Sequence, residues 1–167
     1  RQVRTVSELC HILSKPEQPL WHESWIAAAN FNTEEIANID LESIISAAII
    51  GLESKKVAKA DTQIKTAILD TLINMASKAQ GENLESTNLL LNSVTNFILN
   101  LNPNPDEIIF LLDGLQYLER DLDIYLKFDE KTLQKLTIIV EDFKLMGNNS
   151  DPYNIKVRWH KAIGKAS

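Results

Sequence analysis

Residues 104–122 read NPDEIIFLLDGLQYLERDL and contain the signals of an α-helix in the expected order. Asn104 is a favourable N-cap, and Pro105 suits the first helical position, where a backbone N–H has no partner within the helix. Leucine and isoleucine then recur three and four residues apart from Ile108 to Leu122, and we expect this stripe to continue to Tyr125. The stretch predicts a long amphipathic helix with one buried face.

The same pattern recurs on both sides of this stretch. Capping residues such as Asp40, Asp61 and Asp129 precede further apolar stripes of helical period. The predicted helices of the main part of the chain begin near residues 41, 62, 84, 106, 130 and 152. Their starts are about 22 residues apart, so a helix pair recurs about every 43 residues.

The first 39 residues predict shorter helices. One apolar stripe runs over residues 3–13, and residues 20–29 place Trp21 and Trp25 on one helix face. We expect this tryptophan pair to anchor the segment onto the domain's own core, the alternative being a docking helix for another protein. Residues 32–35 resemble a capping box that opens a further turn or two of helix.

In helix rhythm, residues 40–167 resemble the HEAT and armadillo repeat superfamily, whose repeats span about 40–47 residues. The resemblance implies an all-α domain of about eight helices in a short right-handed array. The six regular helices of residues 40–167 would form the array, and the helices of residues 1–39 would pack on it. A closed helical bundle with short loops gives a similar spacing and is the alternative fold.

Composition restricts the protein class. The chain has 167 residues, 44% of them hydrophobic and 24% charged, and a net charge of −6, which is typical of a globular domain. No apolar run is long enough for a membrane helix, and one cysteine, Cys10, excludes a disulfide framework. The chain begins at Arg1 without a signal-peptide pattern, so we expect a domain excised from a larger intracellular protein of the cytoplasm or nucleus.

No residue constellation predicts catalysis. Only Glu8 and His11 form a Glu-x-x-His pair, whereas a di-iron site needs two such pairs. Cys10 falls on an apolar stripe, where a small buried hydrophobe is the usual role. Glycine-rich phosphate-binding loops are missing from the sequence. We therefore expect a non-enzymatic protein without cofactor, metal or small-molecule substrate.

One helix face provides the sharpest binding hypothesis. Four asparagines recur at intervals of four residues, and two leucines lie among them: Asn88, Asn92, Asn96, Asn100, Leu89 and Leu99. Four asparagines in place of alanine cost a helix about 2 kcal/mol, a cost that favours a role for the amides in binding a partner's backbone. If the amides are free, alanine at Asn92 and Asn96 should leave the melting temperature unchanged or raise it. The alternative is a solvated polar face.

The charge distribution suggests the chemistry of the partner. Residues 81–151 hold 13 acidic and five basic side chains, and we expect Asp113, Glu119 and Asp123 to border the asparagine face. Such a surface favours a peptide or helix of a partner protein, basic partners included. The chain would then act as a scaffold or regulatory module.

The last 16 residues supply the alternative function. They hold four basic and no acidic side chains, namely Lys156, Arg158, Lys161 and Lys165, which favours nucleic-acid binding. The neighbouring Trp159 belongs to the inward stripe and is predicted to lie in the core, not to stack on bases. An acidic domain would also oppose phosphate binding, so protein recognition is the first hypothesis.

Overall fold

The computed structural model describes residues 5–32, 37–57, 59–78, 83–146 and 158–160. Within these ranges the chain is all-α and contains no strand. The helices are α1 (Val6–Leu13), α2 (Trp21–Ala29), α3 (Asn38–Leu52), α4 (Thr62–Ala76), α5 (Asn83–Leu99), α6 (Pro105–Leu122) and α7 (Glu130–Met146). Residues 158–160 form one further turn of helix. The predicted all-α class is confirmed.

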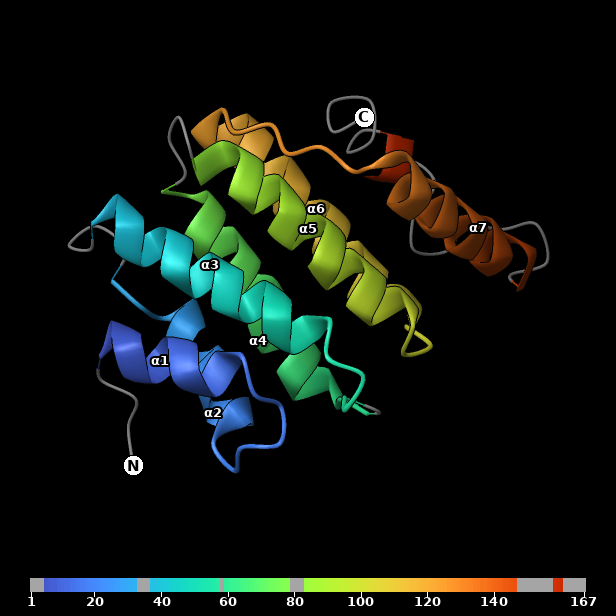
Figure 1. The fold of residues 1–167 in the computed structure, drawn as a ribbon. Coiled ribbons are helices and arrows are strands. Elements are labelled where there is room, and N and C mark those ends of the chain that lie inside the picture. The colour runs from blue at the N-terminus through green and yellow to red at the C-terminus, as the bar shows by residue number, and fades with distance from the viewer. Residues whose placement is uncertain (1–4, 33–36, 58, 79–82, 147–157, 161–167) are drawn as a thin grey trace.

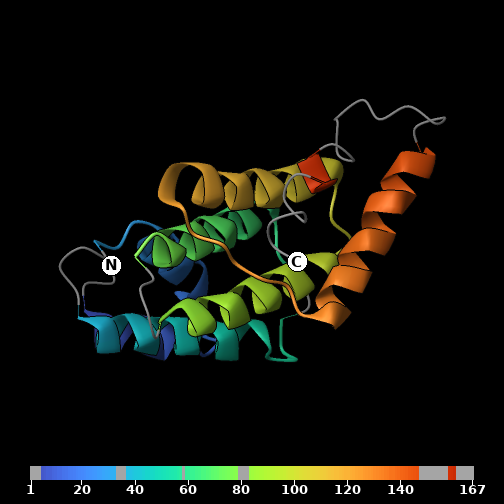
Figure 2. The same ribbon diagram turned by 90° about the horizontal axis from the view of Figure 1, so that it is seen from above.

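The helices lie in two rows (Figures 1 and 2). In one row α3 packs between α1 and α5, and α7 packs on α5. In the other row α4 packs between α2 and α6. Contacts of α1 with α2 and of α4 with α5 join the rows around one continuous hydrophobic core. Because each helix buries one apolar stripe between the rows, its opposite face is left for solvent or for a partner.

Several predicted helix starts are confirmed. The Asn104 side chain accepts a hydrogen bond from the Glu107 N–H at 3.0 Å, and the Glu107 carboxylate accepts one from the Asn104 N–H at 3.0 Å, a complete capping box. Asp61 caps α4 by accepting from the Ile64 N–H at 2.9 Å. The start of α3 was predicted wrongly: the helix begins at Asn38, and Asp40 lies in its first turn.

The end of α6 also differs from the prediction. The helix stops at Leu122 because Asp123 adopts a left-handed conformation with φ of 55°, which an aspartate tolerates better than most residues. The Ile124 N–H then donates to the Leu118 carbonyl at 2.9 Å and turns the chain away from the helix axis. Tyr125 consequently leaves the predicted stripe and is exposed.

The tryptophan pair anchors α2 in the core, as predicted. Trp21 and Trp25 are both buried, with their rings edge to face at 5.8 Å. The Trp21 indole N–H donates to the Leu13 carbonyl at 3.0 Å, which joins the end of α1 to the start of α2. The Thr71 hydroxyl of α4 shares its proton between the Ala67 carbonyl of its own helix at 2.8 Å and the Trp25 carbonyl at 3.1 Å, and the second contact links α2 to the next helix in its row.

Two predictions fall largely outside the described residues: the capping box of residues 32–35 and the last helix, of which only residues 158–160 are described. Trp159 packs against the core, as its place on the inward stripe predicts. No helix in the described ranges has both the length and the apolar character needed to cross a bilayer.

Candidate functional site

The asparagine face of α5 binds the chain's own backbone. Asn88 accepts a hydrogen bond from the Lys127 N–H at 2.8 Å. Asn92 donates to the Lys127 carbonyl at 3.3 Å and accepts from the Asp129 N–H at 2.9 Å. The two amides therefore hold the segment that connects α6 to α7 through main-chain contacts alone.

This connecting segment, residues 124–129, is extended and alternates in burial. Leu126 and Phe128 are buried in the core, whereas Tyr125 and Lys127 are exposed. Exposing the two buried side chains would cost about 1.5–3 kcal/mol each, so the segment is a permanent part of the fold. Two amides of α5 and the burial of two apolar side chains in the core thus hold the segment in place.

The third amide orients the start of α7. Asn96 donates to the Thr132 hydroxyl at 2.8 Å, and the Thr132 N–H donates to the Asp129 carboxylate at 2.7 Å. That backbone hydrogen bond, reinforced by the Thr132 hydroxyl, lowers the pKa of Asp129 below its usual value. Asn88, Asn92 and Asn96 are hereafter called the asparagine ladder. Since the ladder is structural, the expectation that alanine at Asn92 and Asn96 preserves stability is corrected.

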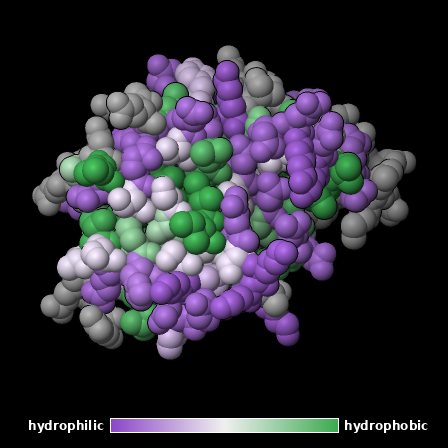
Figure 3. Space-filling view, viewed as in Figure 1, coloured by the Kyte–Doolittle hydropathy of each residue, from purple (hydrophilic) through white to green (hydrophobic). Residues whose placement is uncertain are grey.

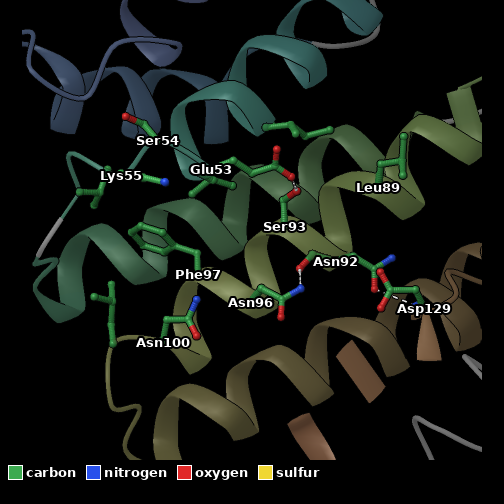
Figure 4. Close-up of a pocket in the computed structure, with 14 residues that line it drawn as sticks. Glu53, Ser54, Lys55, Leu89, Asn92, Ser93, Asn96, Phe97, Asn100 and Asp129 are labelled. Carbon is green, nitrogen blue, oxygen red and sulfur yellow. Dashed lines mark hydrogen bonds between the residues drawn. The ribbon is translucent and has the colours of Figure 1, made fainter. Parts of the chain in front are cut away.

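A groove of about 590 Å³ lies beside the ladder (Figure 4). It is bounded by the last turn of α3 with the loop that follows, by α5, and by the start of α7. Its apolar wall consists of Ile49, Leu52, Val57, Leu89, Phe97 and Leu101. Its polar lining includes Glu53, Lys55, Asn92, Asn96, Asn100 and Asp129. This α3–α5 groove is the strongest candidate binding site in the described part of the chain.

Some polar groups of the groove have hydrogen-bond or ion-pair partners and others do not. Glu53 accepts a hydrogen bond from the Ser93 hydroxyl at 3.0 Å, and Figure 4 shows the two side chains pointing toward one another. Among the described residues, Lys55 has no carboxylate within ion-pair distance, and Asn96 Oδ1 is buried without a hydrogen-bond donor. The groove therefore retains hydrogen-bonding capacity that the described chain does not use.

The structure divides the predicted partner-binding residues. It brings Leu89, Asn92, Asn96 and Asn100 to the α3–α5 groove. Leu99, expected to be available to a partner, is buried in the core, because it lies on the side of α5 that faces the packed helices.

The predicted acidic border is not part of the groove. Asp113, Glu119 and Asp123 belong to α6 and its end, in the row behind α5, and none of them lines it (Figure 1). The distribution of charge along the sequence could not predict this separation. Helices α5 and α6 are consecutive in the chain, but they lie in different rows. Sequence reasoning instead missed Glu53 and Lys55, which follow α3 and carry no motif.

The basic tail meets one of these acidic residues. Arg158 pairs with Asp113 at 3.6 Å, and Gln116 donates to the Arg158 carbonyl at 3.4 Å. Residues 158–160 thus dock on α6, with Trp159 half-buried. Lys156, Lys161 and Lys165 lie outside the described residues.

Within the described ranges, Cys10 and the potential metal ligands do not come together in a site. Burial raises the pKa of the half-buried Cys10 thiol, and the Asp40 carboxylate raises it further, so the reactive thiolate is disfavoured. No group of three or more potential metal ligands occurs among the residues described.

Comparison with known proteins identifies no relative. The chain matches no protein-family model, and no similar curated protein or solved structure was found. The α3–α5 groove is therefore the main indication of function.

Proposed function

We propose that the chain is a non-catalytic protein-recognition domain, a scaffold or regulatory module that binds a segment of a partner protein in the α3–α5 groove. The observation that carries the proposal is the binding of the Lys127 and Asp129 backbone by the asparagine ladder. The same face of α5 that holds this extended backbone continues into the groove at Asn96 and Asn100.

The surface around the groove supports the proposal. Ile50 and Leu89 are 59% and 58% exposed, Leu89 lines the groove, and Ile50 adjoins the lining residue Ile49. Figure 3 shows apolar side chains gathered over α3 and α5 with hydrophilic ones around them. An apolar centre with a polar rim is the usual composition of a protein interface.

The order of packing supports a HEAT- or armadillo-like array as the proposed arrangement. Each of α3, α4 and α5 packs on the helices two positions before and after it in the chain. Stacked helix pairs produce this pattern in solenoids, whereas a closed bundle brings its first and last helices together. We place such a module in the cytoplasm or the nucleus.

Selection of peptides tests the proposed function. A library of random peptides displayed on phage is selected on the domain, and the enriched peptides are measured against Leu89→Ser and Ile138→Ser. Ile138 lies on α7, is 60% exposed and does not line the groove, so it is a matched control for Leu89. We expect Leu89→Ser to weaken binding about tenfold, the effect of losing roughly 1.4 kcal/mol of apolar contact, and Ile138→Ser to leave it unchanged. Peptides indifferent to Leu89→Ser would contradict the proposal.

Nucleic-acid binding is the second candidate, favoured by the four basic side chains of the last 16 residues. If it holds, Lys161→Glu with Lys165→Glu abolishes binding, and the wild-type affinity falls steeply with salt. Affinity purification from a cell extract, with nuclease added to one half, separates the two functions. Partners that survive nuclease favour protein recognition, and partners lost with nuclease favour the basic tail.

A further inference from the structure

We infer that the α3–α5 groove selects an extended partner segment in which a lysine or arginine stands beside an apolar side chain. The inference rests on the proposed function and specifies the chemistry of its partner. Its basis is the excess of hydrogen-bond acceptors and negative charge in the part of the groove that the chain itself leaves open.

The groove is lined by two carboxylates and one lysine. Glu53 and Asp129 are its acidic residues, and Lys55 is its only basic residue within the described part of the chain. The hydrogen bonds from Ser93 to Glu53 and from Thr132 to Asp129 come from neutral donors and leave both charges in place. A carboxylate accepts about four hydrogen bonds, so acceptor positions remain for a cationic donor.

The end of α3 adds to the negative potential. Helix α3 ends at Leu52, where Leu52 and Glu53 line the groove. The end of α5 is already approached by Lys65, whose Nζ donates to the Leu101 carbonyl at 3.5 Å, so the α3 end is the one left for a partner. The C-terminus of a helix carries a partial charge of about −0.5, which favours nearby cations. The positive N-terminus of α7 lies at Asp129 and offsets part of the charge of that carboxylate, so Glu53 is the more available of the two.

The apolar wall explains why a basic side chain alone is insufficient. Ile49, Val57 and Leu101 are partly exposed along the groove and offer a surface that a charged head group does not cover, whereas an aliphatic or aromatic neighbour does. From Leu89 to Asn100 the helix spans about 16 Å. An extended segment of about five residues has this length. The hydrogen bonds of the ladder to the Lys127 and Asp129 backbone support the binding of an extended backbone at this face of α5.

The peptides enriched by phage display are used to test this inference. Those that bind the Leu89→Ser variant more weakly are called groove-dependent, and only these are compared. We expect them to share a lysine or arginine within two residues of a large apolar residue, and to bind about tenfold more weakly when that cation is replaced by glutamine. Glu53→Gln should weaken the same peptides about three- to tenfold, and Lys55→Gln should tighten them about twofold.

Glu42→Gln is the matched control, because Glu42 accepts a hydrogen bond from Ser86 at 2.7 Å across the same helix pair but lies outside the groove. It should leave peptide affinity unchanged. Groove-dependent peptides that are acidic or uncharged, or that respond equally to both glutamate variants, would overturn the inference and leave the proposed function intact. A selection without groove-dependent peptides would overturn both.

Discussion

At the scale of the residue, identical side chains on α5 have different roles. Asn88, Asn92 and Asn96 bind backbone or hydroxyl groups of residues 127–132, and Asn100 is exposed one turn further on. Sequence spacing placed the four on one face correctly. It did not show that the chain itself occupies three of them, because the bound segment is about 35 residues away in sequence and contains no motif.

Asn92→Ala should therefore destabilise the protein. The variant loses two hydrogen bonds to residues 127–129 and gains helix propensity, so we expect a net loss of about 1–2 kcal/mol in the free energy of unfolding. Asn100→Ala, which breaks none of these bonds, should be neutral or up to about 0.5 kcal/mol more stable. Urea unfolding at neutral pH measures both. Equal stabilities of the two variants would contradict a structural role for the ladder.

The cap of α7 gives the stability a pH dependence. Hydrogen bonds from Thr132 lower the pKa of Asp129 in the folded state, so its contribution is present above the pKa of the unfolded state and disappears as the pH falls through the folded value. Asp129→Ala should cost about 1 kcal/mol at pH 7.

The difference between wild type and Asp129→Ala should narrow as the pH falls below about 5 and passes through the lowered pKa of Asp129. Urea unfolding across this range, with tryptophan fluorescence as the signal, measures it. A constant difference down to pH 2 would show that the carboxylate charge is not what stabilises the helix start.

At the scale of the element, two glycines lie inside helices for different reasons. A Cβ on Gly51 of α3 would collide with the Leu13 carbonyl oxygen, a backbone atom that also accepts the Trp21 indole N–H. A Cβ on Gly114 of α6 would come within 2.7 Å of the Ile73 Cδ1, the mobile end of a side chain. Only the first contact involves an atom that cannot move without shifting a helix.

Gly51→Ala should thus lose about 2–3 kcal/mol despite its better helix propensity, as the close approach of α1 and α3 is disturbed. Gly114→Ala should change stability by less than about 1 kcal/mol, because propensity offsets a small shift of Ile73. Thermal unfolding of both variants is the test. A larger loss at Gly114 than at Gly51 would contradict the packing described for α1 and α3.

The end of α6 illustrates the limit of periodicity. The apolar stripe that predicts α6 runs on to Tyr125, past the true end of the helix at Leu122. Two further apolar residues, Leu126 and Phe128, follow it. Burial of these two residues in the core stabilises the extended segment in place of another helical turn. The spacing of apolar residues indicates which side chains can be buried. Whether the backbone that carries them is helical or extended depends on the part of the core that they pack against.

At the scale of the whole molecule, a buried ion pair joins two helices that are distant in sequence and packed together in space. Lys65 of α4 contacts Glu107 of α6 at 2.9 Å, and their side chains are only 9% and 6% exposed. Glu107 also completes the capping box of α6 with Asn104. The pair thus connects the starts of two neighbouring helices in the same row.

Lys65→Met should cost about 3 kcal/mol, because it leaves the Glu107 charge buried without its cation. Adding Glu107→Gln should restore at least about 1 kcal/mol, since glutamine preserves the capping box and removes the charge. A double-mutant cycle by urea unfolding gives the coupling energy. Strictly additive losses would show that the two residues act independently.

The sequence by itself determined the all-α class, the position of most helices to within a few residues, the caps Asp61, Asn104 and Asp129, and the anchoring of the tryptophan pair. These features depend on neighbours within one or two helical turns, where spacing and capping chemistry act directly. Tertiary structure alone decided that the ladder binds residues 127–132, that the acidic residues of α6 lie away from the groove, and that Glu53 and Lys55 line it. Each of these depends on which helices share a row, and rows are set by packing between segments tens of residues apart.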